Sequence, residues 1–68
     1  MQLLNLRLTA NLTQAQLAQR IKVNQTTISK YEKFKAKPPL EKMQKLADAL
    51  NVDLVTIVDC FATKKDQN

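Results

Sequence analysis

The segment from Leu12 to Glu32, LTQAQLAQRIKVNQTTISKYE, constrains the fold of this 68-residue chain more than any other part of it. It contains two short stretches in which apolar residues recur at helical spacing, and only about three residues separate them. In the first stretch, Thr13 and Gln16 have the spacing of a capping box, which satisfies free amides at the start of a helix. We expect this helix to end near Ile21. Its buried stripe should consist of Leu17, Ala18 and Ile21.

The second stretch is predicted to be a helix over residues 24–33. Asn24 is a favourable N-cap residue, and Ile28 and Tyr31 lie on one face, which we expect to be buried. The opposite face carries Gln, Thr, Ser and Lys where an ordinary surface helix would include acids. On a helical wheel with about 100° per residue, this polar strip consists of Gln25, Thr26, Ser29, Lys30 and Lys33.

Three further helices are expected elsewhere in the chain. Apolar residues recur at helical spacing over residues 3–10, 40–50 and 54–61. Asn11 and Asn51 tolerate the left-handed conformation, so we expect them to end the first two of these helices. Pro39 is suited to the start of the second, and Asp53 to the cap of the third.

The chain is predicted to form one small helical domain with a thin core. No segment shows the alternation of a strand, and we assign the domain to residues 1–62. Residues 63–68, TKKDQN, have nothing to bury and are expected to form a mobile tail. The longest apolar runs span two or three residues and no signal peptide is recognisable, so we expect neither a membrane segment nor export.

The sequence offers few groups for chemistry. Cys60 is the single cysteine and there is no histidine, so an internal disulfide, a zinc site and a thiol–imidazole pair are all excluded. The acidic residues form no convincing pair beside a nucleophile, and no glycine loop could cradle a phosphate. We therefore expect no enzyme, no cofactor and no metal, and a location in the reducing cytoplasm.

The positive charge is unevenly distributed. The net charge is +5, and residues 20–45 contain eight basic side chains but only two acidic ones, Glu32 and Glu41. Such clustering is typical of a protein that binds a polyanion, although a solvated lysine-rich surface has the same composition.

The segment 14–31 resembles the helix-turn-helix of the Cro/phage-repressor type, also called XRE-like. The resemblance rests on the spacing of Gln14, Leu17, Ala18, Ile21, Val23, Ile28 and Tyr31. It extends over about residues 3–61, with VNQTTISKYE in the place of the recognition helix. It implies an all-α, compact five-helix bundle of the lambda-repressor-like type, in which the second and third helices form the helix-turn-helix.

The chain departs from the pattern of this family at its turns. The family usually has glycine at four of them, whereas this chain has no glycine. Asn11, Lys22, Phe34 (or its neighbour Lys33) and Asn51 occupy those positions. Lys22 would cost about 1 kcal/mol in a left-handed conformation, unless the turn follows a different path. We expect the Phe34 ring to fold back on the core rather than to remain exposed.

The polar strip has the dimensions and the chemistry to enter a DNA major groove. The resemblance implies base contacts from the start and the middle of the recognition helix. By position these residues are Gln25, Thr26, Ser29 and Lys30. Glutamine can bind adenine in bidentate fashion, threonine can meet a thymine methyl, and lysine can donate to guanine. For each residue the alternative is an ordinary solvated side chain.

Phosphate contacts are expected on either side of this strip. The resemblance places Gln14 against a phosphate, where it can also brace Gln25. The remaining candidates are Asn24, Lys33, Lys35 and Lys37. Arg7 and Glu32 occupy positions at which relatives pair the first helix with the end of the third, and we interpret them as a structural ion pair.

Residues 54–62 are apolar nearly all round, and a chain this small has nothing internal to cover their outer side. The resembled family also places its dimer contacts toward this end. We therefore expect a homodimer through Val55, Val58 and Phe61, with the alternative that Phe61 belongs to the core. Two-fold pairing would present two recognition helices about 34 Å apart, or one DNA turn.

The sequence predicts a sequence-specific transcriptional regulator, a repressor that occupies a palindromic or pseudopalindromic operator on double-stranded DNA. The alternative is a protein-interaction module, such as an antitoxin that neutralises a partner protein and also binds its own promoter. A polar recognition face without acids favours DNA over a protein partner.

Overall fold

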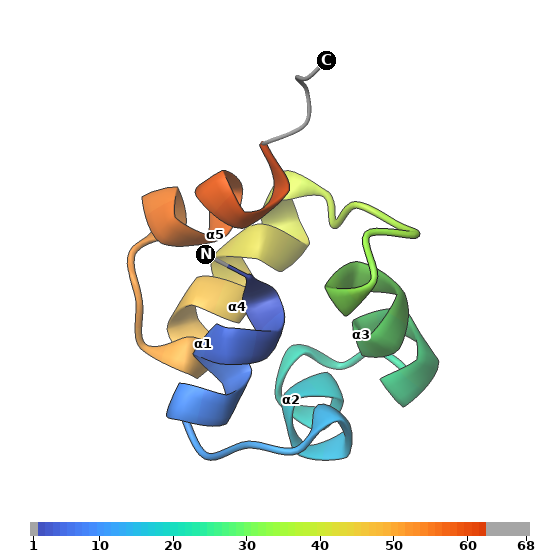
Figure 1. Cartoon of the computed structure of the whole chain (residues 1–68). Coiled ribbons are helices and arrows are strands. Elements are labelled where there is room, and N and C mark those ends of the chain that lie inside the picture. The colour runs from blue at the N-terminus through green and yellow to red at the C-terminus, as the bar shows by residue number, and fades with distance from the viewer. Residues whose placement is uncertain (1, 63–68) are drawn as a thin grey trace.

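The structure is a computed structural model that describes residues 2–62 of the chain. These residues form five α-helices and no strand (Figure 1). The helices are α1 (Leu3–Thr9), α2 (Gln14–Ile21), α3 (Gln25–Glu32), α4 (Leu40–Leu50) and α5 (Leu54–Phe61). The predicted five-helix, lambda-repressor-like architecture is confirmed. The tail expected over residues 63–68 lies outside the described residues.

The helix starts differ in how they are capped. The predicted capping box of α2 forms, because the Thr13 hydroxyl accepts from the Gln16 amide at 3.0 Å and the Gln16 side chain accepts from the Thr13 amide at 2.9 Å. Asn24 and Asp53 are the N-cap residues of α3 and α5, but neither side chain makes a capping hydrogen bond. Pro39 precedes α4 as its N-cap instead of occupying its first turn. Only α2 therefore gains the full stabilisation of its cap.

Four turns pass through the left-handed region without glycine. Asn11, Lys22, Phe34 and Asn51 have φ angles of 63°, 63°, 61° and 58°. These are the positions at which the family pattern predicts a left-handed residue, and Phe34 rather than Lys33 fills the third of them. The turn between α2 and α3 thus follows the expected path, at the cost of placing a lysine, whose Cβ is crowded in the left-handed conformation, where glycine fits best.

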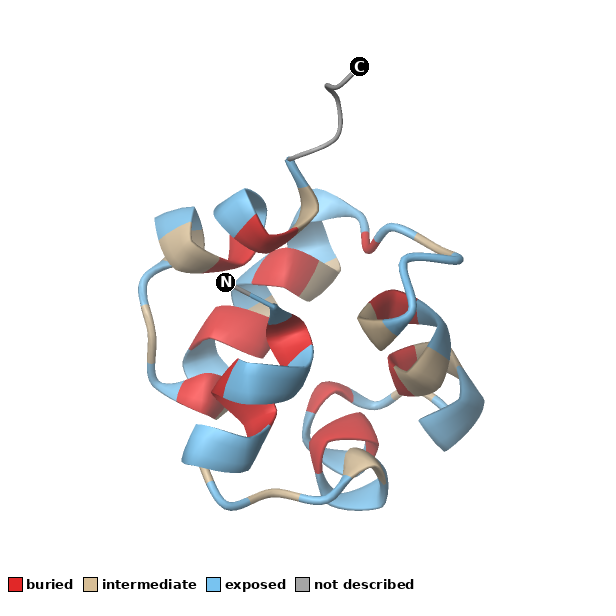
Figure 2. Cartoon of the chain, in the orientation of Figure 1, coloured by how far each residue is buried: buried red, intermediate tan, exposed pale blue. Residues whose placement is uncertain are grey.

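The core lies where the helices face one another, and Figure 2 shows the buried residues on these inward faces. Ala18 of α2 is buried and α2 packs against α3, as expected where a small side chain allows two helices to approach closely. The same α2 also packs on α4, and α4 on α5. The buried apolar cluster consists of Leu3, Leu6, Leu17, Ala18, Ile21, Ile28, Tyr31, Met43, Leu46, Ala47, Leu50, Ile57 and Cys60.

Burial also sets the chemistry of two titratable groups in this core. It raises the pKa of the Tyr31 hydroxyl and that of the Cys60 thiol, so both groups stay protonated near neutral pH. Cys60 is free and buried, as expected of a residue that fills the core. None of the helices within residues 2–62 has the length and apolar character needed to cross a membrane.

Candidate nucleic-acid interface

The outer face of α3 is polar and carries no exposed acid. α3 lies at one edge of the molecule, next to α2 (Figure 1). Gln25, Thr26 and Lys30 are exposed on it, and Ser29 is partly buried. Glu32 is the only acidic residue of α3, and its side chain is turned inward and is 6% exposed. The helix therefore presents amide, hydroxyl and ammonium groups without a carboxylate to repel a polyanion.

Arg7 of α1 holds the inward carboxylate. Its Nε donates to Glu32 Oε2 and its Nη2 to Glu32 Oε1 at 3.4 Å, while Nη1 donates to the Leu12 carbonyl at 2.9 Å. The Arg7 and Glu32 side chains are 10% and 6% exposed. A buried ion pair of this kind is costly to break from one side, because the remaining charge loses its partner. The pair joins α1 to the end of α3, across 25 positions in the sequence.

Two glutamines continue this network to the surface. Gln14, the first residue of α2, donates from Nε2 to Glu32 Oε1 at 2.9 Å. Its Oε1 accepts from Nε2 of Gln25, the first residue of α3, at 3.4 Å. An unbroken chain thus runs from Arg7 through Glu32 and Gln14 to Gln25. Sequence reasoning paired Arg7 with Glu32 and Gln14 with Gln25, but it did not find the link between Gln14 and Glu32.

The candidate phosphate contacts surround α3. Asn24 precedes the helix and Lys33 follows it, and both are exposed. Lys35 and Lys37 are exposed in the loop between α3 and α4. Gln14 uses one amide hydrogen for Glu32 and retains the other, so it still has a donor for a phosphate oxygen.

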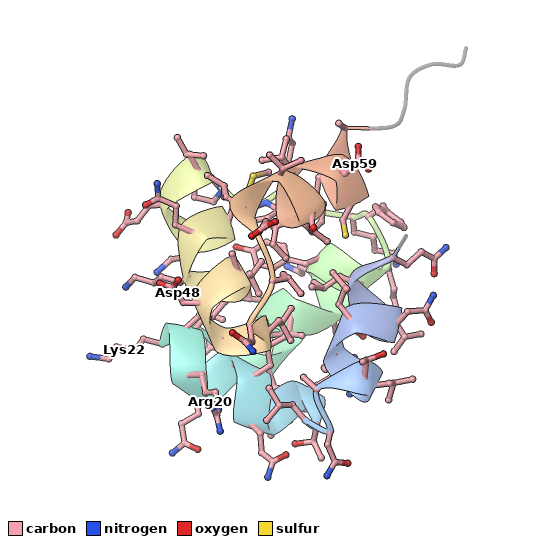
Figure 3. All side chains as sticks on the ribbon, turned by 90° about the vertical axis from the view of Figure 1, so that its left-hand side faces the viewer. Arg20, Lys22, Asp48 and Asp59 are labelled. Carbon is pink, nitrogen blue, oxygen red and sulfur yellow. The ribbon has the colours of Figure 1, made fainter. Side chains whose placement is uncertain are left out.

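The remaining basic charge of the segment 20–45 lies elsewhere. Arg20 and Lys22 extend from the end of α2, on the same side of the molecule as Asp48 of α4 (Figure 3). They line a shallow hollow between α2 and α4 together with Lys45, Asp48 and Ala49. The basic side chains of segment 20–45 therefore do not all lie around α3, because Arg20, Lys22 and Lys45 line this hollow.

The comparison with protein families agrees with this arrangement. Residues 3–57 match the family described as Helix-turn-helix. The chain belongs to this helix-turn-helix family, of the XRE/Cro/C1 type. Its members are DNA-binding proteins and not enzymes, and α2 and α3 are the two helices that give the family its name.

A curated relative is the cryptic phage CTXphi transcriptional repressor RstR of Vibrio cholerae serotype O1 (strain ATCC 39315 / El Tor Inaba N16961), which is 37% identical over 65 residues. The match covers 96% of this helix-turn-helix chain and 58% of the relative, so the chain spans little more than half of that protein's length. No solved structure matches the chain.

Proposed function

We propose that this protein is a transcriptional repressor that binds a palindromic operator on double-stranded DNA, with α3 in the major groove. In this proposal Gln25, Thr26, Ser29 and Lys30 contact base edges, and phosphate contacts are made by Gln14, Asn24, Lys33, Lys35 and Lys37. Repression results from occupation of the operator. The protein acts where the DNA is, in the cytoplasm.

The observation that carries the proposal is the exposed, acid-free face of α3, together with the inward turn of Glu32. An exposed carboxylate on this face would repel phosphates, whereas its burial against Arg7 leaves a surface of donors and acceptors. The kinship with RstR, whose name describes a transcriptional repressor, supports repression rather than activation.

A homodimer is part of the proposal, because a palindromic operator is read by two copies related by a two-fold axis. Val55 and Val58 of α5 are 76% and 38% exposed, which is unusual for large apolar residues that lie close together. Val58 also lines a hollow with Leu40 and Met43 of α4, and Leu40 is itself exposed. This apolar surface would be covered by a second copy. Phe61 is partly buried by contacts inside its own chain, so it contributes less area than Val55.

Selection of bound duplexes from a random pool, using the full chain, tests the proposed function. We expect enrichment of a two-fold symmetric motif whose half-sites lie about one DNA turn apart. The affinity for the winning duplex should fall steeply with salt, with a log–log slope of about 0.9 for each phosphate contact. A pool in which no motif is enriched, with equal binding to all duplexes, would contradict a sequence-specific regulator.

A further inference from the structure

The series of hydrogen bonds from Glu32 through Gln14 to Gln25 runs in one direction, because each side-chain amide donates to the group nearer the core. An ionised carboxylate can only accept hydrogen bonds, so Gln14 has to present its Nε2 to Glu32. The Oε1 of Gln14 then faces Gln25 and accepts a hydrogen bond from the Nε2 of Gln25. Each amide is thereby oriented by the group behind it.

We infer that Glu32 sets the base preference of the recognition helix from inside the protein, by fixing the orientation of the Gln25 amide through Gln14. Glu32 is thus a positioning residue for specificity, in addition to its part in the ion pair with Arg7. This inference rests on the proposed function, because it concerns the base that Gln25 contacts.

The orientation decides what Gln25 offers to the groove. Because Gln14 takes one Nε2 hydrogen of Gln25, Gln25 keeps its Oε1 acceptor and its second Nε2 hydrogen for the groove. Adenine presents the complementary pair in the major groove, with the N6 amino group as a donor and N7 as an acceptor. If the Gln25 amide were turned by about 180°, its Oε1 would face adenine N7 and its Nε2 would face the N6 amino group, so neither hydrogen bond could form. The orientation of the Gln25 amide, fixed by these hydrogen bonds, therefore favours adenine.

The Glu32 carboxylate, at the inner end of this hydrogen-bond series, is held in a fixed position. Both Glu32 oxygens accept from Arg7, and Arg7 is itself fixed by the Leu12 carbonyl. The carboxylate is almost fully buried, so water does not compete for it. Glu32 and Gln25 are seven positions apart on α3, or nearly two turns, and so lie on the same side of the helix, where Gln14 of α2 bridges them.

Glu32→Gln tests this inference, because an amide has the size of the carboxylate but can donate as well as accept. The base pair that Gln25 contacts is first identified as the one at which Gln25→Ala loses its preference. The quantity to measure is then the affinity for the selected operator divided by the affinity for operators changed at that base pair. We expect this ratio to be roughly 10- to 100-fold in the wild type, as for a good bidentate contact. In Glu32→Gln it should fall by about threefold or more, through relatively tighter binding to the wrong bases.

Arg7→Lys is the matched control. It weakens the same buried pair, and should lower the melting temperature, but it keeps a carboxylate at position 32. We expect the base-preference ratio of this variant to stay near that of the wild type. An equal fall of the ratio in both variants would mean that Glu32 acts only by stabilising the fold, and would overturn the inference.

Gln14→Leu provides a second test should Glu32→Gln fail to fold, because it breaks the chain and leaves the ion pair intact. Its overall affinity should fall through the loss of a phosphate contact, and its base-preference ratio should fall as well. An unchanged ratio in Gln14→Leu, or in folded Glu32→Gln, overturns the inference while leaving the proposed function standing. If Gln25→Ala alters the preference at no base pair, both the inference and the proposed base contact of Gln25 are wrong.

Discussion

The ring of Phe34 meets the ring of Phe61 edge to face, with centroids 6.2 Å apart and planes inclined at 67°. Phe61 meets Tyr31 of α3 in the same way at 6.3 Å, so the ring at the end of α5 contacts both α3 and the residue at position 34. The expectation that Phe34 folds back on the core instead of remaining exposed is therefore wrong: its ring contacts the partly buried Phe61 at the edge of the core, and Phe34 is 51% exposed. This contact connects the loop after α3 to α5.

Phe34→Asn should lower the free energy of unfolding by about 1 kcal/mol. Asparagine tolerates the left-handed backbone of this position and relieves some strain, but it loses the edge-to-face contact and the burial of half a ring. Chemical denaturation of the two proteins measures the difference. A variant more stable than the wild type would show that backbone strain at position 34 outweighs everything that the ring contributes.

Lys22→Gly should have the opposite effect. Lys22 is exposed and has φ 63° and ψ 48°, so its Cβ is strained. Glycine removes this strain and should stabilise the protein by about 0.5–1 kcal/mol, after allowance for the greater freedom of the unfolded chain. For a domain of this size the melting temperature should rise by about 2–8 °C. Lys22→Ala, which loses the charge but keeps the Cβ, is the control and should show no such rise.

Lys30→Ala separates a base contact from a phosphate contact. Lys30 is exposed in the middle of α3, and if it reads a guanine, its loss should cost about 1–3 kcal/mol on the selected operator and relax the preference at one base pair in each half-site. Lys37→Ala, in the loop beyond α3, should weaken binding to all sequences evenly and lower the salt slope by about 0.9. Binding to the operator, its single-base variants and random DNA at several salt concentrations distinguishes the two patterns. Identical patterns for both variants would argue against a base contact by Lys30.

Val55→Glu tests the dimer. A carboxylate at this exposed position of α5 would be buried without a partner in the proposed interface, so the variant should sediment as a monomer where the wild type is a dimer. Its affinity for the full operator should fall, while its affinity for a half-site is unchanged. Leu8→Glu places the same charge on an exposed apolar residue of α1 and should leave the dimer intact. A wild type that stays monomeric at high micromolar concentration, with and without DNA, would contradict the dimer.

Local signals in the sequence were sufficient for the helices and for part of their turns. The capping box of Thr13 and Gln16 and the left-handed Asn51 depend on neighbours only a few positions away, and the structure has them where they are expected. The left-handed Lys22 followed only from the family resemblance, with a different turn path as the alternative. The link between Gln14 and Glu32 spans 18 positions and leaves no periodic pattern, because it depends on how α2 and α3 cross. The same limit applies to Phe34, whose ring found a partner 27 positions later in the chain.

α3 is proposed to contact base edges in the major groove, and 7-deazapurines test this placement directly. Substituting 7-deazaadenine or 7-deazaguanine at one operator position at a time removes the N7 acceptor from the major groove and leaves Watson–Crick pairing intact. We predict a loss of about 1 kcal/mol, or roughly fivefold in affinity, at matching positions of both half-sites. At the adenine assigned to Gln25 this loss should disappear in the Gln25→Ala variant. Unchanged affinity at every substituted position of the selected operator would contradict the placement of α3 in the major groove.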